Sequence, residues 1–233
     1  MMASVEAALR ALREGSFVLV YDADGREEET DLVVASQFVG PTAVRTLRQD
    51  GGGLICVTVD PRVRRKLGLP TMAEILGHAY RAYPVLRGTI PDDVRYDTNS
   101  PFSITVNHRE TFTGVTDRDR ALTISRFATL VEEALRRPNG WAVEAFGREF
   151  RSPGHVHLLA ASDGLLEARR GHTELSTALV SMAGLAPSAT ICEMMGDDGR
   201  ALSRGDAKKY AATRNLVFLE GREILEAWQR WSA

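Results

Sequence analysis

The segment 22–29 concentrates negative charge around a single arginine, Arg26. Its acidic residues are Asp22, Asp24, Glu27, Glu28 and Glu29. Carboxylates this close repel one another, and a divalent cation relieves that repulsion. Mg²⁺ prefers one or two carboxylates together with waters and substrate oxygens. The segment lies between two short apolar runs, so we expect a loop that either binds a cation or is a solvated acidic loop without chemistry.

A second candidate is the run Arg169-Arg170-Gly171-His172-Thr173, which stands at the entry to a predicted helix. A helix N-terminus offers unpaired amides and the positive end of a dipole, and both suit phosphate. Arginine adds a planar, permanently charged donor group. His172 is a candidate metal ligand or base. The alternative is an ordinary capping turn with surface arginines.

Two further residues could move protons. His155 stands at the start of a predicted strand, where a histidine is either a proton shuttle or a structural group. Glu193 lies in the apolar run 190–194, where burial would raise its pKa toward a useful acid–base range. The alternative for Glu193 is a glutamate on an edge strand that faces water.

The elements that must position these residues follow from the apolar pattern. Short apolar runs predict strands near 17–21, 32–35, 54–59, 102–106, 156–160, 190–194 and 216–219. Helical spacing predicts helices within 5–15, 41–51, 61–68, 121–135, 175–184 and 224–231, and Ser203 with Asp206 resembles a capping pair. The segment 69–100 has poor periodicity, so we expect mainly loop there. Strands that alternate with helices predict α/β layers in a single domain, residues 1–233.

Composition narrows the class of protein. The 233 residues carry a formal net charge of −2, which gives no basic footprint for nucleic acid. The only cysteines, Cys56 and Cys192, exclude a disulfide scaffold and a four-thiolate zinc site. We therefore expect reduced thiols and a cytosolic setting. No signal peptide and no apolar stretch long enough for a membrane span stands out, so we expect no membrane association.

Taken together, the segments resemble one family, the 3,4-dihydroxy-2-butanone 4-phosphate synthases of riboflavin biosynthesis. The matching stretches occur in the family's order and cover most of the chain: Tyr21 to Ala35, Gly53 to Val57, Thr113 to Arg120, Arg151 to Leu158, Arg170 to Leu175 and Cys192 to Gly199. The residues Arg26 to Asp31 and Phe112 to Leu122 are more similar to the archaeal branch than to the bacterial one.

The resemblance implies a carbon–carbon lyase that converts D-ribulose 5-phosphate into L-3,4-dihydroxy-2-butanone 4-phosphate and formate. It also implies dependence on Mg²⁺ or Mn²⁺, a three-layer α/β/α fold with a mixed twisted sheet, a homodimer and a cytoplasmic location. Some members are fused to a zinc-dependent cyclohydrolase. Too few residues follow Glu193 for that domain and its cysteines are missing, so we expect a monofunctional enzyme.

The resemblance also implies roles for single residues, carried over by motif position. Glu27 and His172 would be the metal ligands and would also contact the substrate, as would Glu193. Arg26 and Asp31 would contact the sugar, and the run Arg169, Arg170, Gly171, His172 and Thr173 would hold the phosphate. His155 and Glu193 would be needed for catalysis.

The chemistry explains why such a site needs several acid–base groups. A cation stabilises an enediolate as the proton on carbon 3 leaves, the hydroxyl on carbon 1 departs as water, the skeleton rearranges, and hydration releases carbon 4 as formate. We assign the first base to Asp31, with Glu29 in reserve. Gly25 and Thr30 depart from the bacterial pattern, which bears on how the acidic loop closes.

Two other classes of protein remain open from the residues alone. A metal-dependent phosphosugar isomerase or aldolase would use similar groups but would not release formate. A non-catalytic anion-binding module would need none of the acid–base residues. Such a module is disfavoured because Glu27, His172, His155 and Glu193 are all present.

Overall fold

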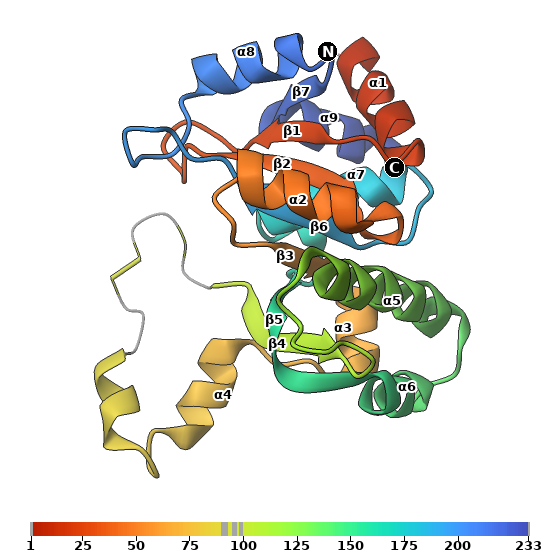
Figure 1. Ribbon diagram of the computed structural model, residues 1–233, viewed down its shortest axis with the longest axis vertical. Helices are drawn as coiled ribbons and strands as arrows, with labels where there is room; N and C mark the ends of the chain where they lie inside the picture. Colours follow the sequence, from red (N-terminus) through yellow and green to blue (C-terminus); the bar gives the residue numbers. More distant parts are fainter. Residues whose placement is uncertain (1, 90–92, 95–96, 98–99, 233) are drawn as a thin grey trace.

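The protein is described by a computed structural model, which covers residues 2–89, 93–94, 97 and 100–232 (Figure 1). The described residues form a seven-stranded mixed sheet in the order β4-β5-β3-β6-β2-β1-β7. The strands are β1 (Val18–Tyr21), β2 (Thr30–Ala35), β3 (Cys56–Val59), β4 (Phe102–His108), β5 (Phe150–Ala160), β6 (Ala189–Glu193) and β7 (Val217–Glu220). The pairs β1–β7 and β3–β5 are parallel, and the other neighbouring pairs are antiparallel.

The central strands β1, β2, β3 and β6 are buried on both faces, which explains their short, nearly continuous apolar runs. Successive side chains of a strand point to opposite faces of a sheet. In β1, Leu19 belongs to the apolar cluster on one face, whereas Val18 and Val20 belong to the cluster on the other. Each central strand therefore helps to hold two helical layers.

Helices cover both faces, which gives the predicted three-layer α/β/α arrangement (Figure 1). One layer contains α1 (Met2–Arg13), α7 (His172–Met182) and α9 (Gly221–Trp231). The other contains α2 (Pro41–Asp50), α3 (Pro61–Leu67), α5 (Asp117–Arg136), α6 (Trp141–Glu149) and α8 (Arg204–Thr213). No helix in the described ranges combines the length and the hydropathy of a membrane span.

Local capping sets where several of these helices begin. The side chain of Asp60 accepts a hydrogen bond from the amide of Arg62 before α3, and Ser203 accepts one from Asp206 before α8, which confirms both predicted starts. Thr116 caps α5 in the same way. Such caps satisfy amides that the first turn of a helix leaves unpaired.

The prediction for segment 69–100 is wrong in part. It contains α4 (Met72–Ala79) and a 3₁₀ helix, Pro84–Thr89. The helix α4 begins with a capping box between Thr71 and Glu74 and buries none of its residues, so it leaves no apolar periodicity in the sequence. Residues 90–92, 95–96 and 98–99 of the same segment lie outside the described residues. The short helix α6 was also not predicted.

Candidate active site

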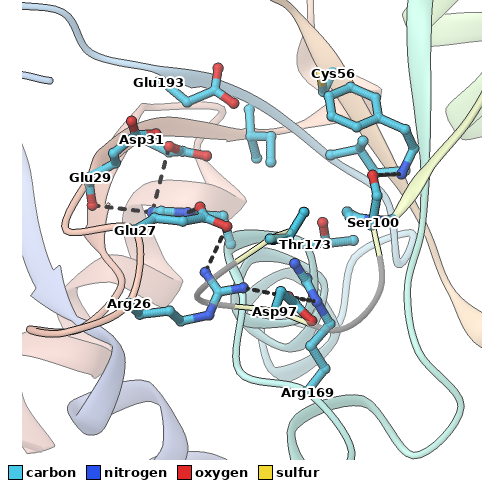
Figure 2. Close-up of a pocket in the computed structure, with 16 residues that line it drawn as sticks. Arg26, Glu27, Glu29, Asp31, Cys56, Asp97, Ser100, Arg169, Thr173 and Glu193 are labelled. Atoms are coloured by element: carbon cyan, nitrogen blue, oxygen red, sulfur yellow. Dashed lines mark hydrogen bonds and ion pairs between the residues drawn. The ribbon is translucent and has the colours of Figure 1, made fainter. Parts of the chain in front are cut away.

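A cavity of about 450 Å³ opens where the acidic loop, the start of α7 and the end of β6 meet (Figure 2). The described residues that line it are Arg26, Glu27, Glu29, Asp31, Cys56, Val94, Asp97, Ser100, Pro101, Phe102, Leu159, Arg169, His172, Thr173, Ile191 and Glu193. The carboxylates of Glu29, Asp31 and Glu193 gather at one end, and Arg169 lies at the other. The cavity thus presents an acidic end and a basic end to one ligand.

The base of the acidic loop is closed by Asp22, its first residue after β1, which is buried. Asp22 Oδ2 accepts hydrogen bonds from the amide of Glu27 at 3.0 Å and from Arg26 Nη1 at 3.2 Å. Its Oδ1 accepts from the amide of Glu29 at 3.1 Å. These bonds fix the backbone on which the site carboxylates stand.

Glu27 and His172 meet although they lie 145 residues apart, with 3.0 Å between Glu27 Oε2 and His172 Nδ1. Burial alone would raise the pKa of Glu27, but the hydrogen bond and charge of His172 outweigh it and lower the pKa to about 2. Burial alone would lower the pKa of His172, but Asp31 and Glu27 outweigh it and raise the pKa to about 9. Atoms of Asp22, Glu27 and His172 lie within 4.8 Å of one another, close enough for these residues to hold a metal ion.

Asp31 and Glu193 stand directly opposite each other on the antiparallel strands β2 and β6. Both oxygens of Asp31 are buried, and neither makes a hydrogen bond with the described residues. Its Oδ1 lies 3.5 Å from His172 Nε2. Burial raises the pKa of Asp31 well above its usual range, and it also raises the pKa values of Glu29 and Glu193. Like charges this close favour a proton shared within the group.

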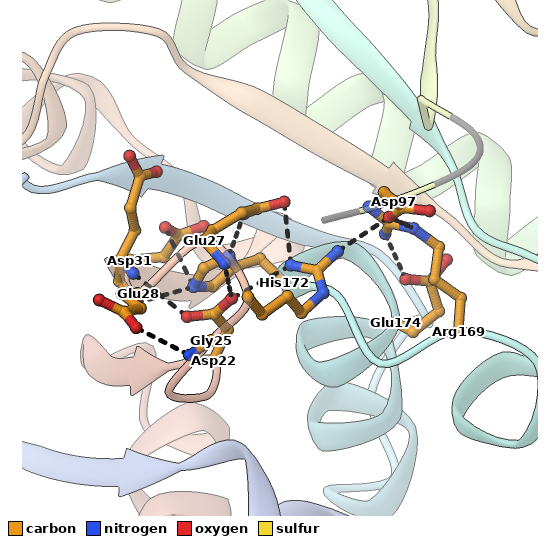
Figure 3. Close-up of polar contacts among 11 residues, drawn as sticks. Asp22, Gly25, Glu27, Glu28, Asp31, Asp97, Arg169, His172 and Glu174 are labelled. Carbon is orange, nitrogen blue, oxygen red and sulfur yellow. Dashed lines mark hydrogen bonds and ion pairs between the residues drawn. The ribbon is translucent and has the colours of Figure 1, made fainter. Parts of the chain in front are cut away.

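The basic end is organised by two carboxylates around Arg169 (Figure 3). Arg169 Nη1 donates to Glu174 Oε2 at 2.6 Å, and Arg169 Nε donates to Asp97 Oδ2 at 2.6 Å. The same Asp97 oxygen accepts from Arg26 Nη2 at 3.0 Å. Thr173 lines the cavity beside them, in the first turn of α7. Two guanidinium groups at a helix start form a binding place for an anion.

Gly171 precedes α7 and explains why the two arginines can approach the helix start. A Cβ atom at Gly171 would lie 2.3 Å from Arg169 Nη1 and 2.6 Å from Arg26 Nη2. A side chain at this position would therefore displace both guanidinium groups.

Two residues of the predicted site lie elsewhere. Arg170 is exposed and lines a smaller cavity with Asp22 and Arg222, and it is not among the described residues around the main cavity. His155 is also exposed and does not line the main cavity. Cys56 of β3 is buried and borders the main cavity as well.

Three residues that contact the predicted site residues were not predicted: Asp97 and Glu174, which bind Arg169, and Asn107, which binds His155. Asp97 lies in the segment that lacked periodicity, where no pattern marks it. Glu174 had a usable signal, because an acid in the first turn of a helix directly after an arginine-rich motif can reach back to that motif. Asn107 contacts His155 across the neighbouring strands β4 and β5.

Comparisons with known proteins point to one family. The model of the family described as 3,4-dihydroxy-2-butanone 4-phosphate synthase matches residues 6–227. The chain is 50% identical to the 3,4-dihydroxy-2-butanone 4-phosphate synthase of Methanothermobacter thermautotrophicus, over 97% of this chain and 96% of that protein. It is 48% identical to that of Archaeoglobus fulgidus, over 99% of this chain and 96% of that protein.

A solved structure of such a synthase in complex with two magnesium ions superposes with a TM-score of 0.72 and 26% identity, covering 97% of this chain and 96% of that one. The family model, the relatives and the fold agree along nearly the whole chain. The chain belongs to the 3,4-dihydroxy-2-butanone 4-phosphate synthase family, the lyases of riboflavin biosynthesis.

Proposed function

We propose that the chain converts D-ribulose 5-phosphate into L-3,4-dihydroxy-2-butanone 4-phosphate and formate, with Mg²⁺ or Mn²⁺ as the cofactor. The observation that carries the proposal is the two-ended cavity of about 450 Å³. Its carboxylates and His172 suit the hydroxyketone end of a phosphosugar, and its arginines suit the phosphate. This supports the family's activity over simple anion binding.

The residues present fit a divalent cation. Glu27 and His172 offer an oxygen and a nitrogen 3.0 Å apart, and the buried oxygens of Asp31 nearby lack hydrogen-bond donors among the described residues. We assign Glu27 and His172 as the protein ligands. When bound, the cation supplies Lewis-acid stabilisation of the negative charge on the enediolate oxygens.

The phosphate is assigned to the basic end. Arg169 and Thr173 provide direct donors, and Arg26 contacts the sugar. Gly171 acts at the backbone level, because it leaves the space that the guanidinium groups of Arg169 and Arg26 need. Arg170, which follows Arg169 but lines a different cavity, stays a predicted contact from the family resemblance. Fixing the phosphate at one end orients the reacting carbons toward the acids at the other.

The proton transfers are assigned to the acidic end. Asp31 is the first base, because its oxygens are unoccupied by donors in the described structure and its raised pKa suits a group that takes and returns a proton. Glu29 stands in reserve. Glu193, opposite Asp31, returns a proton to the hydroxyl that leaves carbon 1.

His155 leads to the proposal of a homodimer. By its motif position, His155 matches a residue that the family needs for catalysis. It nevertheless lies outside the main cavity of its own chain. Beside it, Phe112 is 94% exposed and Val115 is 51% exposed, which leaves an apolar turn uncovered. We propose that this corner packs on a second copy and that His155 completes the partner's site.

The remaining assignments follow from the substrate and the sheet. A phosphorylated sugar is held inside cells by its charge, which supports a cytoplasmic enzyme. One hydrogen-bonded sheet joins all the described strands, which supports a single domain over residues 1–233.

The proposed function is tested by incubating the protein with ribulose 5-phosphate and following formate, with and without Mg²⁺. We expect formate only with the metal, and a loss of about a hundredfold or more in Glu27→Gln. Glu28→Gln is the matched control, because Glu28 is exposed and bonds only the amide of Gly25 in the same loop. Turnover of the sugar without formate would instead indicate an isomerase or aldolase. The absence of any turnover would indicate a non-catalytic anion-binding module.

A further inference from the structure

Asn107, near the end of β4, is 4% exposed and lies against His155 of β5. Asn107 Oδ1 accepts a hydrogen bond from the backbone amide of His155 at 2.8 Å. Asn107 Nδ2 lies 3.4 Å from the carbonyl oxygen of Thr113. An amide N–H can only donate and a carbonyl oxygen can only accept, so these two partners fix which end of the Asn107 carboxamide is which.

That orientation determines the state of the His155 ring. Asn107 Nδ2 lies 3.1 Å from His155 Nδ1. Because Nδ2 is a donor only, Nδ1 must accept, and the single proton of the neutral ring then sits on Nε2. Asn107 Oδ1 is 3.4 Å from His155 Nδ1, a longer contact than the 3.1 Å from Nδ2, so Nδ2 is the partner of the ring nitrogen.

Gly114 holds the carboxamide in place. Its φ is +100°, and a Cβ atom there would lie 2.0 Å from Asn107 Nδ2. Any other residue would push the amide away from His155. The turn 113–116 therefore has two structural roles. Gly114 leaves room for the Asn107 carboxamide, and Thr116 caps α5.

We infer that Asn107 is a positioning residue that keeps neutral His155 as its Nε2–H tautomer. The inference rests on the proposed catalytic role of His155 and sharpens it. In this tautomer Nε2 donates a hydrogen bond and cannot accept a proton. His155 therefore stabilises negative charge on a substrate oxygen as a neutral hydrogen-bond donor, and the carboxylates of the main cavity carry the proton transfers.

The tautomer is read directly by ¹⁵N NMR of histidine-labelled protein, at a pH where the ring is neutral. His155→Gln identifies the signal by its loss. We expect Nε2–H in the wild-type protein and Nδ1–H in Asn107→Asp, because a carboxylate can only accept and so calls for a donor at Nδ1. Asn139→Asp, an exposed site, is the matched control and should leave the tautomer unchanged.

Kinetics separate positioning from general damage. In Asn107→Asp at low pH, the doubly protonated ring still donates from Nε2. At high pH the neutral ring does not. We therefore expect the ratio of variant to wild-type kcat to fall with rising pH, to about one tenth or less, since losing one hydrogen-bond donor to developing negative charge costs roughly 10²–10³-fold.

An Nδ1–H tautomer in the wild-type protein would overturn the inference, and so would a kcat ratio that does not change with pH. These outcomes are distinct from a failure of the proposed function. If the wild-type protein makes no formate, the function falls, while NMR still reports whether Asn107 sets the tautomer.

Discussion

The buried carboxylates of the site accept different numbers of hydrogen bonds. This number indicates whether a carboxylate stabilises the structure or is available for proton transfer. Asp22 accepts from two backbone amides and from Arg26. Glu174 accepts from Arg169 and, at 2.9 Å, from the amide of Ser162. Asp31 meets no hydrogen-bond donor among the described residues. A saturated carboxylate stabilises structure, whereas one without donors is available for proton transfer.

Glu174→Gln tests the structural role. Glutamine keeps an acceptor for Ser162 but removes the charge that holds Arg169, so the guanidinium loses its fixed orientation. We expect KM for ribulose 5-phosphate to rise about tenfold with a smaller effect on kcat. We also expect the free energy of unfolding to fall by roughly 1–3 kcal/mol. Steady-state kinetics and urea denaturation measure both.

The matched control is Glu167→Gln, because Glu167 is an exposed glutamate on the same connection between β5 and α7. It should behave as the wild type. An unchanged KM in Glu174→Gln would show that Arg169 does not need this partner.

At this scale the sequence was informative about which residues matter and uninformative about how they pair. The family motifs named Glu27, Asp31, Arg169 and Glu193, and these four residues line one cavity. Spacing could not join Glu27 to His172, because contact across 145 residues depends on the order of the strands.

Among the elements, the acidic loop between β1 and β2 combines a tight backbone with groups whose charges depend on pH. Gly25 and Glu28 both have positive φ, of +78° and +59°. Gly25 donates its amide to Glu28 Oε1 at 2.7 Å. The loop therefore closes on itself at its exposed tip while Asp22 closes it at its base.

The buried groups beside this loop, His172, Asp31 and Glu193, make the stability of the metal-free protein depend on pH. The pKa of His172, raised to about 9 by Asp31 and Glu27 against the effect of burial, exceeds the value of about 6.5 in an unfolded chain. Its contribution is fully present below the unfolded value and is lost as pH rises through about 9. Burial is the largest cause that raises the pKa values of Asp31 and Glu193. Their contribution to the free energy of unfolding is therefore also lost as pH rises, and the loss begins at a lower pH because the unfolded pKa of a carboxyl is lower than that of histidine.

We therefore expect the Tm of the protein in EDTA to fall between about pH 7 and pH 9, by roughly 2–4 °C for each kcal/mol lost. Saturating Mg²⁺ should reduce the fall, since it favours ionised carboxylates and a neutral histidine. His172→Gln, as the comparison variant, should show a shallower dependence. A Tm that rises across this range in EDTA would contradict the prediction. Calorimetric scans provide the measurement.

The elements themselves were predictable where they feed the core. The buried apolar residues of β1, β2 and α5 form the sequence patterns that predict these elements. The helix α4 buries nothing and so was missed. The sheet order, with β6 between β3 and β2, was beyond prediction because strand pairing reflects long-range packing that no local pattern encodes.

On the scale of the whole molecule, the cavity and the His155 corner are separate, and the homodimer proposal joins them. It predicts complementation between two inactive variants, His155→Ala and Glu27→Ala. In a mixed dimer one site carries both changes and the other carries neither. A statistical 1:1 mixture should recover about one quarter of the wild-type activity, because half of the dimers are mixed and each has one intact site.

Formate production by the separately purified variants and by their mixture, after reversible dissociation, measures this. Two preparations of the same variant, mixed in the same way, are the control and should stay inactive. A mixture that stays inactive, although sedimentation shows that the dimers have exchanged subunits, would contradict the prediction. His155 would then act in the site of its own chain or take no part in the reaction.

The placement of β1 beside β7 has a consequence for how the protein is made. Val18 pairs with Val217, and Asp31 pairs with Glu193, so both strands that carry the acidic loop find neighbours synthesised much later. Pairings between such distant segments form slowly. During synthesis the acidic loop leaves the ribosome early. Glu27 cannot form its contact with His172 until another 145 residues have been made. Assembly of the main cavity is therefore a late folding event, and a chain cut short before β6 would carry the acidic loop without Glu193.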